Sequence, residues 1–323
     1  MKRMVLESIR SEYKKDFDKK RDFNKIKKLF TLREKNEFTL DDQTWNDLDM
    51  DKVYEKLDRA YSSPGEAALY SMLRNPLMDE KRLKIRGGLI QSFKENNKLR
   101  ESLQCVFFNL NNDFKNSFLD MMDNNLIINK SKYYIYTFFG KVLPAIAILL
   151  SIFLGKEYIL VLLGLASINM LINNHEVKSI KSTGIFYLRK TIVAAKKIAS
   201  KDNSEITYYR DKIKGILKSI KDIDRGTKLI GFVNMWGGVF ESVSVIFLLE
   251  ESAYYSISDK IKEQKEVLMD LYYTVGELEA LISISGYKNN LHEQFVKPKF
   301  IKEVTLNIVE GIHPLIENAV SNS

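Results

Sequence analysis

The stretch that decides the fold is residues 133–174, which read YYIYTFFGKVLPAIAILLSIFLG, then Lys156-Glu157, then YILVLLGLASINMLINN. Lys141 is the single charge of the first arm, and the second arm, residues 158–174, carries none. A membrane-spanning helix needs about 20 mostly apolar residues, a length that the first arm reaches and the second narrowly misses. Because Lys156-Glu157 forms a polar turn, the sequence predicts a helical hairpin that enters and leaves a membrane on the same side.

Two other interpretations of this hairpin stay open: a buried pair of core helices in a soluble domain, and an exposed interaction surface. A core helix usually keeps a polar stripe, whereas here apolar residues surround both arms. Four lysines flank the base of the hairpin: Lys130, Lys132, Lys178 and Lys181. The positive-inside rule therefore places both flanks in the cytoplasm and the hairpin in the cytoplasmic membrane. A buried hairpin would instead make the protein cytoplasmic.

The remaining composition is that of a helical protein with a sizeable core. The chain has 323 residues, of which 45% are apolar, and a net charge of +8 that suits phosphate backbones or anionic lipid. The single Cys105 excludes an internal disulfide, and three scattered histidines show no metal-ligand spacing. None of the five prolines lies between Pro144 and Pro298. Because an interior proline costs a helix about 3 kcal/mol, this gap favours long helices.

These features predict a mainly α fold: a bundle of long helices with an apolar helical hairpin and short C-terminal β-strands. We expect a basic N-terminal helical segment over 1–38, core helices over 39–132, the hairpin over 133–174, long helices over 175–295 and short strands over 296–323. The N-terminal segment carries an apolar stripe at helical spacing: Ile9, Tyr13, Phe17, Phe23, Ile26 and Phe30. We interpret it as a solvated helix that packs this stripe on the body; the alternative is a helix that contacts nucleic acid or membrane.

Local signals mark several helix ends. The sequence of residues 62–66, Ser-Ser-Pro-Gly-Glu, predicts a serine cap, a proline in the first turn and a glutamate at the positive helix end. The helix that it opens is expected to stop before Pro76. Residues 205–223 read as an amphipathic helix. Residues 229–255 are interpreted as a buried core helix with a glycine pair, not as a third membrane span.

A heptad pattern follows, in which apolar residues recur at alternating steps of four and three. Its members are Ile257, Ile261, Leu268, Leu271, Val275, Leu278 and Ile282, with Gln264 at the one polar place. The pattern predicts extended helices that pack against another long helix of the same domain.

Two stretches resemble the MutS family of ATPases. The first, LDRAYSSPGEAALYSMLRNPL from Leu57, is similar to the turn and helix that open the helical core, or lever, of that family. The matching residues are Leu57, Tyr61, Ser63, Gly65, Leu69, Leu73, Arg74 and Pro76. The second, LYYTVGELEALISISGY from Leu271, is similar to the last lever helix, with Glu279 where the family usually has aspartate.

The segment EGIHPLIE from Glu310 resembles the Glu-Gly-Arg-His-Pro segment that opens the nucleotide-binding domain of this family, with Ile312 in place of arginine. The resemblance covers about residues 39–110 and 229–320 and leaves the hairpin unexplained. It implies that residues 175–295 are lever helices and that 296–323 are the opening strands of an ATPase domain otherwise missing from this chain.

The resemblance implies the core and lever region of a membrane-associated, DNA-repair-type ATPase that couples nucleotide state to helix movement. No Gly-x-x-x-x-Gly-Lys-Ser/Thr loop occurs in the sequence, so we expect no ATP hydrolysis, cofactor or metal in this chain. ATP and Mg²⁺ are expected for the full-length parent. The implied partners are the missing ATPase domain, a membrane, duplex DNA and, in the full-length form, a second copy.

The resemblance also implies roles for individual residues. Pro64 and Gly65 at the first lever turn, and Glu277 and Glu279 on the last lever helix, are expected to couple movements. His313-Pro314 is expected to shape the entrance of the ATPase domain. The alternative role of all six is packing and turn geometry.

Basic residues around the apolar stripe of 205–223 offer phosphate contacts: Lys212, Lys214, Lys218, Lys221 and Arg225. Their alternative role is a solvated helix face. Two other functions remain open for the whole chain. One is a non-enzymatic, membrane-anchored helical scaffold, and the other is a soluble DNA-binding lever domain.

Overall fold

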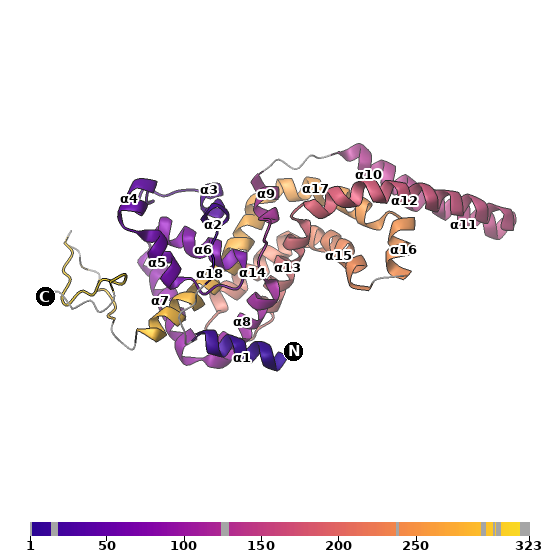
Figure 1. The fold of residues 1–323 in the computed structure, drawn as a ribbon. Helices are drawn as coiled ribbons and strands as arrows, with labels where there is room; N and C mark the ends of the chain where they lie inside the picture. The colour runs from indigo at the N-terminus through magenta and orange to yellow at the C-terminus, as the bar shows by residue number, and fades with distance from the viewer. Residues whose placement is uncertain are drawn as a thin grey trace. The chain divides into compact units, whose positions relative to one another are not determined.

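The computed structural model describes residues 2–13, 19–123, 129–236, 239–291, 295–299, 301 and 305–316, and it is mainly helical, as predicted (Figure 1). The chain divides into two compact units. Unit 1 comprises Met1–Asn111 and Gly276–Ser323, and unit 2 comprises Asn112–Val275. The division falls within helix α18 (Lys265–Asn290), which contributes residues to both.

Unit 1 is built from short and medium helices that precede the hairpin, together with the second part of α18. These helices are α1 (Lys2–Tyr13), α2 (Phe23–Ile26), α3 (Lys28–Leu32), α4 (Asp42–Asp47), α5 (Met50–Leu57), α6 (Ser63–Arg74), α7 (Glu80–Glu95) and α8 (Asn97–Leu110). The signals at residues 62–66 are confirmed. The Ser62 hydroxyl accepts from the Gly65 N–H at 3.4 Å, Pro64 stands in the first turn, and α6 ends at Arg74.

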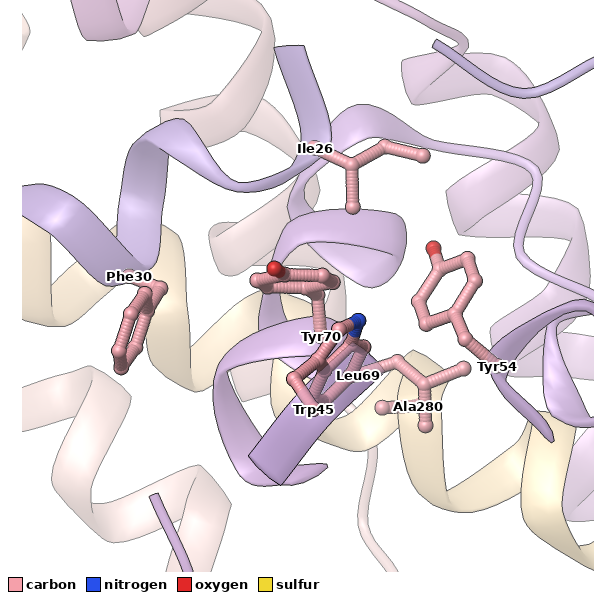
Figure 2. Close-up of a cluster of buried hydrophobic side chains, with 7 residues drawn as sticks. All are labelled: Ile26, Phe30, Trp45, Tyr54, Leu69, Tyr70 and Ala280. Carbon is pink, nitrogen blue, oxygen red and sulfur yellow. The ribbon is translucent and has the colours of Figure 1, made fainter. Parts of the chain in front are cut away.

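An aromatic cluster forms part of the core of unit 1 (Figure 2). Its buried members are Ile26, Phe30, Trp45, Tyr54, Leu69, Tyr70 and Ala280. The rings of Trp45 and Tyr70 lie 4.7 Å apart, and the Arg74 guanidinium lies over the Phe30 and Trp45 rings. Ile26 and Phe30 thus pack the stripe of the basic N-terminal segment into the body, as do the buried Ile9 and Tyr13. Phe17 lies outside the described residues.

Unit 2 holds the apolar hairpin and the helices packed beside it. In chain order these are α9 (Ser117–Asp123), α10 (Lys130–Thr137), a π-helix (Phe138–Val142), α11 (Leu143–Phe153), a 3₁₀ turn (Lys156–Tyr158), α12 (Ile159–Ser182), α13 (Ile185–Ala199), α14 (Thr207–Ser219), α15 (Lys221–Trp236), α16 (Val239–Ile246), α17 (Leu249–Glu263) and the first part of α18. The predicted hairpin is present, with its polar turn at Lys156-Glu157. Its second arm is longer than expected, because α12 continues to Ser182.

Two of the predicted helices are interrupted. The segment 205–223 breaks at Ile220, between α14 and α15, although Ile213, Ile216 and Ile223 are buried as predicted. The segment 229–255 is not one core helix, because α16 ends at Ile246 and Leu248 has left-handed backbone, with φ of 44°. The side chains of 231–241 and the glycine pair 237–238 lie outside the description.

The heptad positions are buried, but the helix carrying them breaks at Gln264, where α17 ends and α18 begins. In unit 1, residues 277–283 of α18 are buried on every face, not along one seam. This part of α18 is therefore a central helix enclosed by its neighbours. The heptad rule missed this because it assumes one partner helix.

The predicted C-terminal β-strands are not supported. Within the described part of the chain there is no strand, and residues 305–308, inside the expected strand, have irregular backbone. Leu306 and Ile308 are 84% and 65% exposed. A strand is stable only where a neighbour completes its hydrogen bonds and covers one face, and the described residues supply neither to this segment.

A close helix contact in unit 1 leads to a stability prediction. A Cβ on Gly276 would collide with the Pro64 carbonyl and lie 2.9 Å from Ala68 Cβ. We expect Gly276→Ala to destabilise unit 1 by about 1–3 kcal/mol, the usual cost of overpacking. Gly88→Ala is the matched control, because Gly88 is exposed in α7 with open space at its Cβ, and it should gain about 0.5–1 kcal/mol. Urea unfolding measures the free energy of unfolding of both variants. If Gly276→Ala were as stable as the wild-type chain, the close contact at Gly276 would be contradicted.

Candidate functional site

The outer surface of the hairpin in unit 2 is both apolar and exposed. Two stretches are long and apolar enough to cross a membrane: Lys130–Phe153, with mean hydropathy 1.9, and Lys156–Ile180, with mean hydropathy 1.3. In the apolar 18-residue part of each stretch, only 22% and 6% of the residues, respectively, are buried. Large side chains such as Phe153, Leu160 and Leu171 are at least 70% exposed. Core helices of a soluble protein bury such side chains, so this exposure favours a lipid environment over a buried hairpin.

The position of Lys141, the one charge in the first arm, is compatible with this environment. It lies on the π-helix and is exposed, about 20 Å along the helix from Leu154 at the tip. In a hydrocarbon layer about 30 Å thick, a lysine at this level can extend its flexible side chain toward the nearer polar surface.

A polar network fastens the base of the hairpin to α17. Lys132 Nζ lies 2.7 Å from Glu176 Oε1, and the Tyr255 hydroxyl donates to Glu176 Oε2 at 2.7 Å. Lys130 pairs with Asp259 at 3.4 Å. Of the flanking lysines, Lys130 and Lys132 are therefore in ion pairs and Lys178 is exposed, while the side chain of Lys181 is outside the description. The network holds the hairpin base beside polar groups.

Unit 1 contains a second candidate site, which we call the Glu279 node: Tyr61, Ser62, Gly65 and Glu279. The Glu279 side chain accepts from the Tyr61 N–H at 2.6 Å and from the Ser62 hydroxyl. A Cβ on Gly65 would collide with the Glu279 carboxylate and lie 2.9 Å from Ala60 Cβ, so a larger residue there would displace Glu279 from this position. Predicted coupling residues from two distant stretches of sequence thus lie in direct contact. Glu279 holds the N-terminus of α6 against α18.

Burial controls the protonation of Glu279. It raises the pKa of the Glu279 carboxyl to about 8, because a charged carboxylate loses its hydration there. The hydrogen bonds from Ser62 and Tyr61 and the charge of Lys19 partly oppose this rise in pKa, while Glu66 adds to it. The carboxyl is therefore poised to exchange a proton near neutral pH.

Charged residues that sequence reasoning missed lie next to the node. Lys19 pairs with Asp58 at 2.9 Å and with Glu66 at 2.8 Å, and Arg21 pairs with Asp58 at 3.1 Å. Asp58 is fully buried. Nothing in the pattern distinguishes Lys19 from the other lysines of its basic run, so only the fold could reveal this cluster.

The remaining predicted residues are more dispersed. Glu277 accepts from Arg86 Nε at 2.7 Å, which ties α18 to α7 within unit 1. His313 and Pro314 are exposed, and His313 Nδ1 accepts from the Leu315 N–H at 3.3 Å. These two lie in a described segment without regular structure.

The predicted phosphate-contact set is partly neutralised. Lys212 pairs with Asp270 at 2.8 Å, and Arg225 lies 3.8 Å from Asp222. Lys214, Lys218 and Lys221 are exposed on α14 and at the start of α15. Acidic partners lower the attraction of this surface for a nucleic-acid backbone. Among the described residues, no group of histidine, cysteine, aspartate and glutamate could hold a metal ion.

The raised pKa of Glu279 gives a testable dependence of stability on pH. The ordinary pKa of this carboxyl is 4.5, so between about pH 4.5 and 8 the unfolded chain is ionised while the folded one holds a proton. Stability should therefore fall as pH rises through this window and level off above it. Glu279→Gln keeps the shape and can donate to Ser62, so it should remove this component.

Urea unfolding of the detergent-solubilised chain from about pH 5 to 9 measures the effect. Glu277→Gln is the control, because it alters a neighbouring carboxylate and should leave the Glu279 component in place. If the free energy of unfolding changed with pH equally in the wild-type chain and in Glu279→Gln, a protonated Glu279 in the folded chain would be contradicted.

Comparisons with protein-family models, with curated proteins and with solved structures gave no match.

Proposed function

We propose that this chain is the helical core and lever region of a membrane-associated MutS-like ATPase, anchored in the bilayer by the hairpin. The observation that carries the proposal is the contact between the two stretches of MutS-like sequence. Pro64 and Gly65 come from the first, and Gly276 and Glu279 come from the second. They are more than 200 positions apart and interlock in one unit. A chance resemblance of two isolated stretches would not require this contact.

The hairpin supports the membrane part of the proposal. It belongs to unit 2, which lies in sequence between the two parts of unit 1. Its exposed apolar side chains would provide a surface for lipid, and its two spanning-length arms, joined by the turn at Lys156-Glu157, would return the chain to the side from which it enters. The positive-inside rule then puts unit 1 in the cytoplasm, where an ATPase domain would have nucleotide.

The work of such a region is mechanical. ATP and Mg²⁺ would bind to a partner ATPase domain that carries the phosphate-binding loop. This chain would respond through two-state packing of its helices. Tight contacts such as Gly276 on Pro64, and the buried Glu279 in its hydrogen-bonded pocket, favour two discrete arrangements over gradual bending. The proposed roles of Glu277 and Glu279 are to hold α7 and α6 on α18 as it moves.

Duplex DNA is a second proposed partner, through Lys214, Lys218 and Lys221. Three exposed lysines would make a weak, salt-sensitive contact, with log affinity falling by roughly 0.9 per phosphate contact for each log unit of salt. The membrane surface has broader support, since it rests on two spanning-length helices.

The test of the proposed ATPase coupling uses the full-length protein that joins this chain to an ATPase domain. We expect His313→Ala to lower MgATP turnover several-fold without changing the melting temperature, because His313 would shape the edge of the nucleotide site. Ile312→Ala is the matched control, since its side chain is also exposed and lies next to His313. Steady-state phosphate release measures turnover. Wild-type turnover in His313→Ala would count against the role, and no ATPase activity in the full-length protein would count against the proposed function.

A further inference from the structure

A break between two helices lies against the hairpin in unit 2. Helix α16 ends at Ile246, Leu248 takes left-handed backbone, and α17 starts at Leu249. We call residues 246–249 the elbow. A helix end leaves carbonyl groups without partners inside the helix, and in hydrocarbon each of them must find a donor in the protein.

The first arm of the hairpin has a similar defect. In the π-helix, the Leu143 N–H donates to the Phe138 carbonyl, five residues back. The donor that would next reach the Phe139 carbonyl in this pattern belongs to Pro144, which has no N–H. Pro144 therefore leaves the Phe139 carbonyl without its normal helical partner.

One buried side chain satisfies both defects. Asn169 lies on α12 and is fully buried, and its amide nitrogen donates to the Phe139 carbonyl at 3.0 Å and to the Ile246 carbonyl at 2.7 Å. Gly140 allows this approach, because a Cβ there would collide with the Phe247 carbonyl and lie 2.9 Å from Leu248 Cβ. Both arms of the hairpin are thus joined to the elbow by polar and steric contacts.

Helix geometry gives the distance of the Gly140 and Asn169 contacts from the hairpin tip. At 1.5 Å per residue, Gly140 lies about 21 Å from Leu154 at the hairpin tip, and Asn169 lies about 17 Å from Tyr158. The corresponding distances for Lys132 and Glu176 are about 33 Å and 27 Å. With a hydrocarbon core about 30 Å thick, the polar network lies at the near surface and the elbow lies within the core.

Contacts along α17 show in which direction this helix runs beside the hairpin. Asn173 donates to Glu251 at 2.6 Å, the Tyr255 hydroxyl to Glu176 at 2.7 Å, and Lys130 pairs with Asp259 at 3.4 Å. From the elbow onward, α17 therefore runs from the level of Asn169 toward the hairpin base. The sequence of residues 242–249, SVSVIFLL, contains no charge, and Val243 is 39% exposed beside the hairpin.

From this geometry we propose that residues 242–249 form a third bilayer-embedded element, which turns at the elbow and returns along α17 toward the hairpin base. Its outer face contacts lipid acyl chains, and Asn169 clamps the turn to the hairpin. This inference rests on the proposed membrane anchoring. The proposal revises the interpretation of residues 229–255 as a buried core helix. At a hydrated helix break, water satisfies the free carbonyls, so a donor from the protein is needed only where water is excluded.

The test uses single-cysteine variants in a Cys105→Ser background, reconstituted in phosphatidylcholine vesicles and labelled with the fluorophore NBD. Val243→Cys reports on the new element, Leu149→Cys on the hairpin and Lys214→Cys on the exposed surface of α14. Lipid carrying a doxyl group on its acyl chain is expected to quench the labels at 243 and 149. Aqueous iodide is expected to quench the label at 214 and to have little effect on the other two.

The outcomes separate the inference from the proposed function. If doxyl lipid quenches the label at 149 while iodide alone quenches the label at 243, the third element is overturned and the anchor remains. If iodide quenches both, the anchor fails as well. Adding Asn169→Leu, which has no donor, should make the label at 243 accessible to iodide and leave the label at 149 unchanged. An unchanged label at 243 would overturn the clamp.

Discussion

The exposed apolar surface of the hairpin is the constraint on which the account of this protein depends. Side chains such as Phe153, Leu160 and Leu171 are at least 70% exposed, and burying a side chain of this size is worth about 1.5–3 kcal/mol. Summed along two spanning-length helices, this exposure is too costly for a chain in water. Lipid would remove this cost, which is the physical reason for the proposed membrane anchor.

The proposed membrane anchor requires that the hairpin be fastened to the helices outside the lipid, and unit 2 offers contacts at two positions along the hairpin. Glu176 joins Lys132 and Tyr255 at the base, where the proposed anchor would leave these charged groups in reach of water. Asn169 donates to two carbonyls nearer the hairpin tip, where the proposed bilayer would leave only the protein to satisfy them. Unit 1 uses the same principle around Glu279, whose burial is tolerated through hydrogen bonds and a raised pKa. Buried polar groups thus specify the geometry in both units.

Much of the fold follows from local signals in the sequence. The hairpin, the Ser62 cap and the end of α6 before Pro76 could be predicted, because each depends on a few neighbouring residues. The breaks at Leu248 and Gln264 could not, since they depend on what packs against the chain there. The C-terminal strands failed for a related reason: a strand needs a partner, and sequence pattern cannot show that one is present.

The candidate sites divide in the same way. The resemblance selected Pro64, Gly65 and Glu279, and the structure brings them together. Lys19 and Asp58 escaped notice because a charge in a charged sequence carries no sign of its burial. Pro144 was visible as a proline in an apolar helix, but the carbonyl that it leaves free and the asparagine that satisfies it lie in different elements.

The most direct measurement of the central claim is an alkaline carbonate wash of membranes from cells expressing the chain. We expect the wild-type chain to stay in the membrane pellet and the double variant Ile146→Lys with Ile168→Lys, at exposed positions about 12 and 15 Å from the hairpin tip, to be extracted. The control variant Phe114→Lys, at an exposed position outside the hairpin, should stay in the pellet. A wild-type chain released by the wash as a folded, soluble protein would contradict a membrane-spanning hairpin.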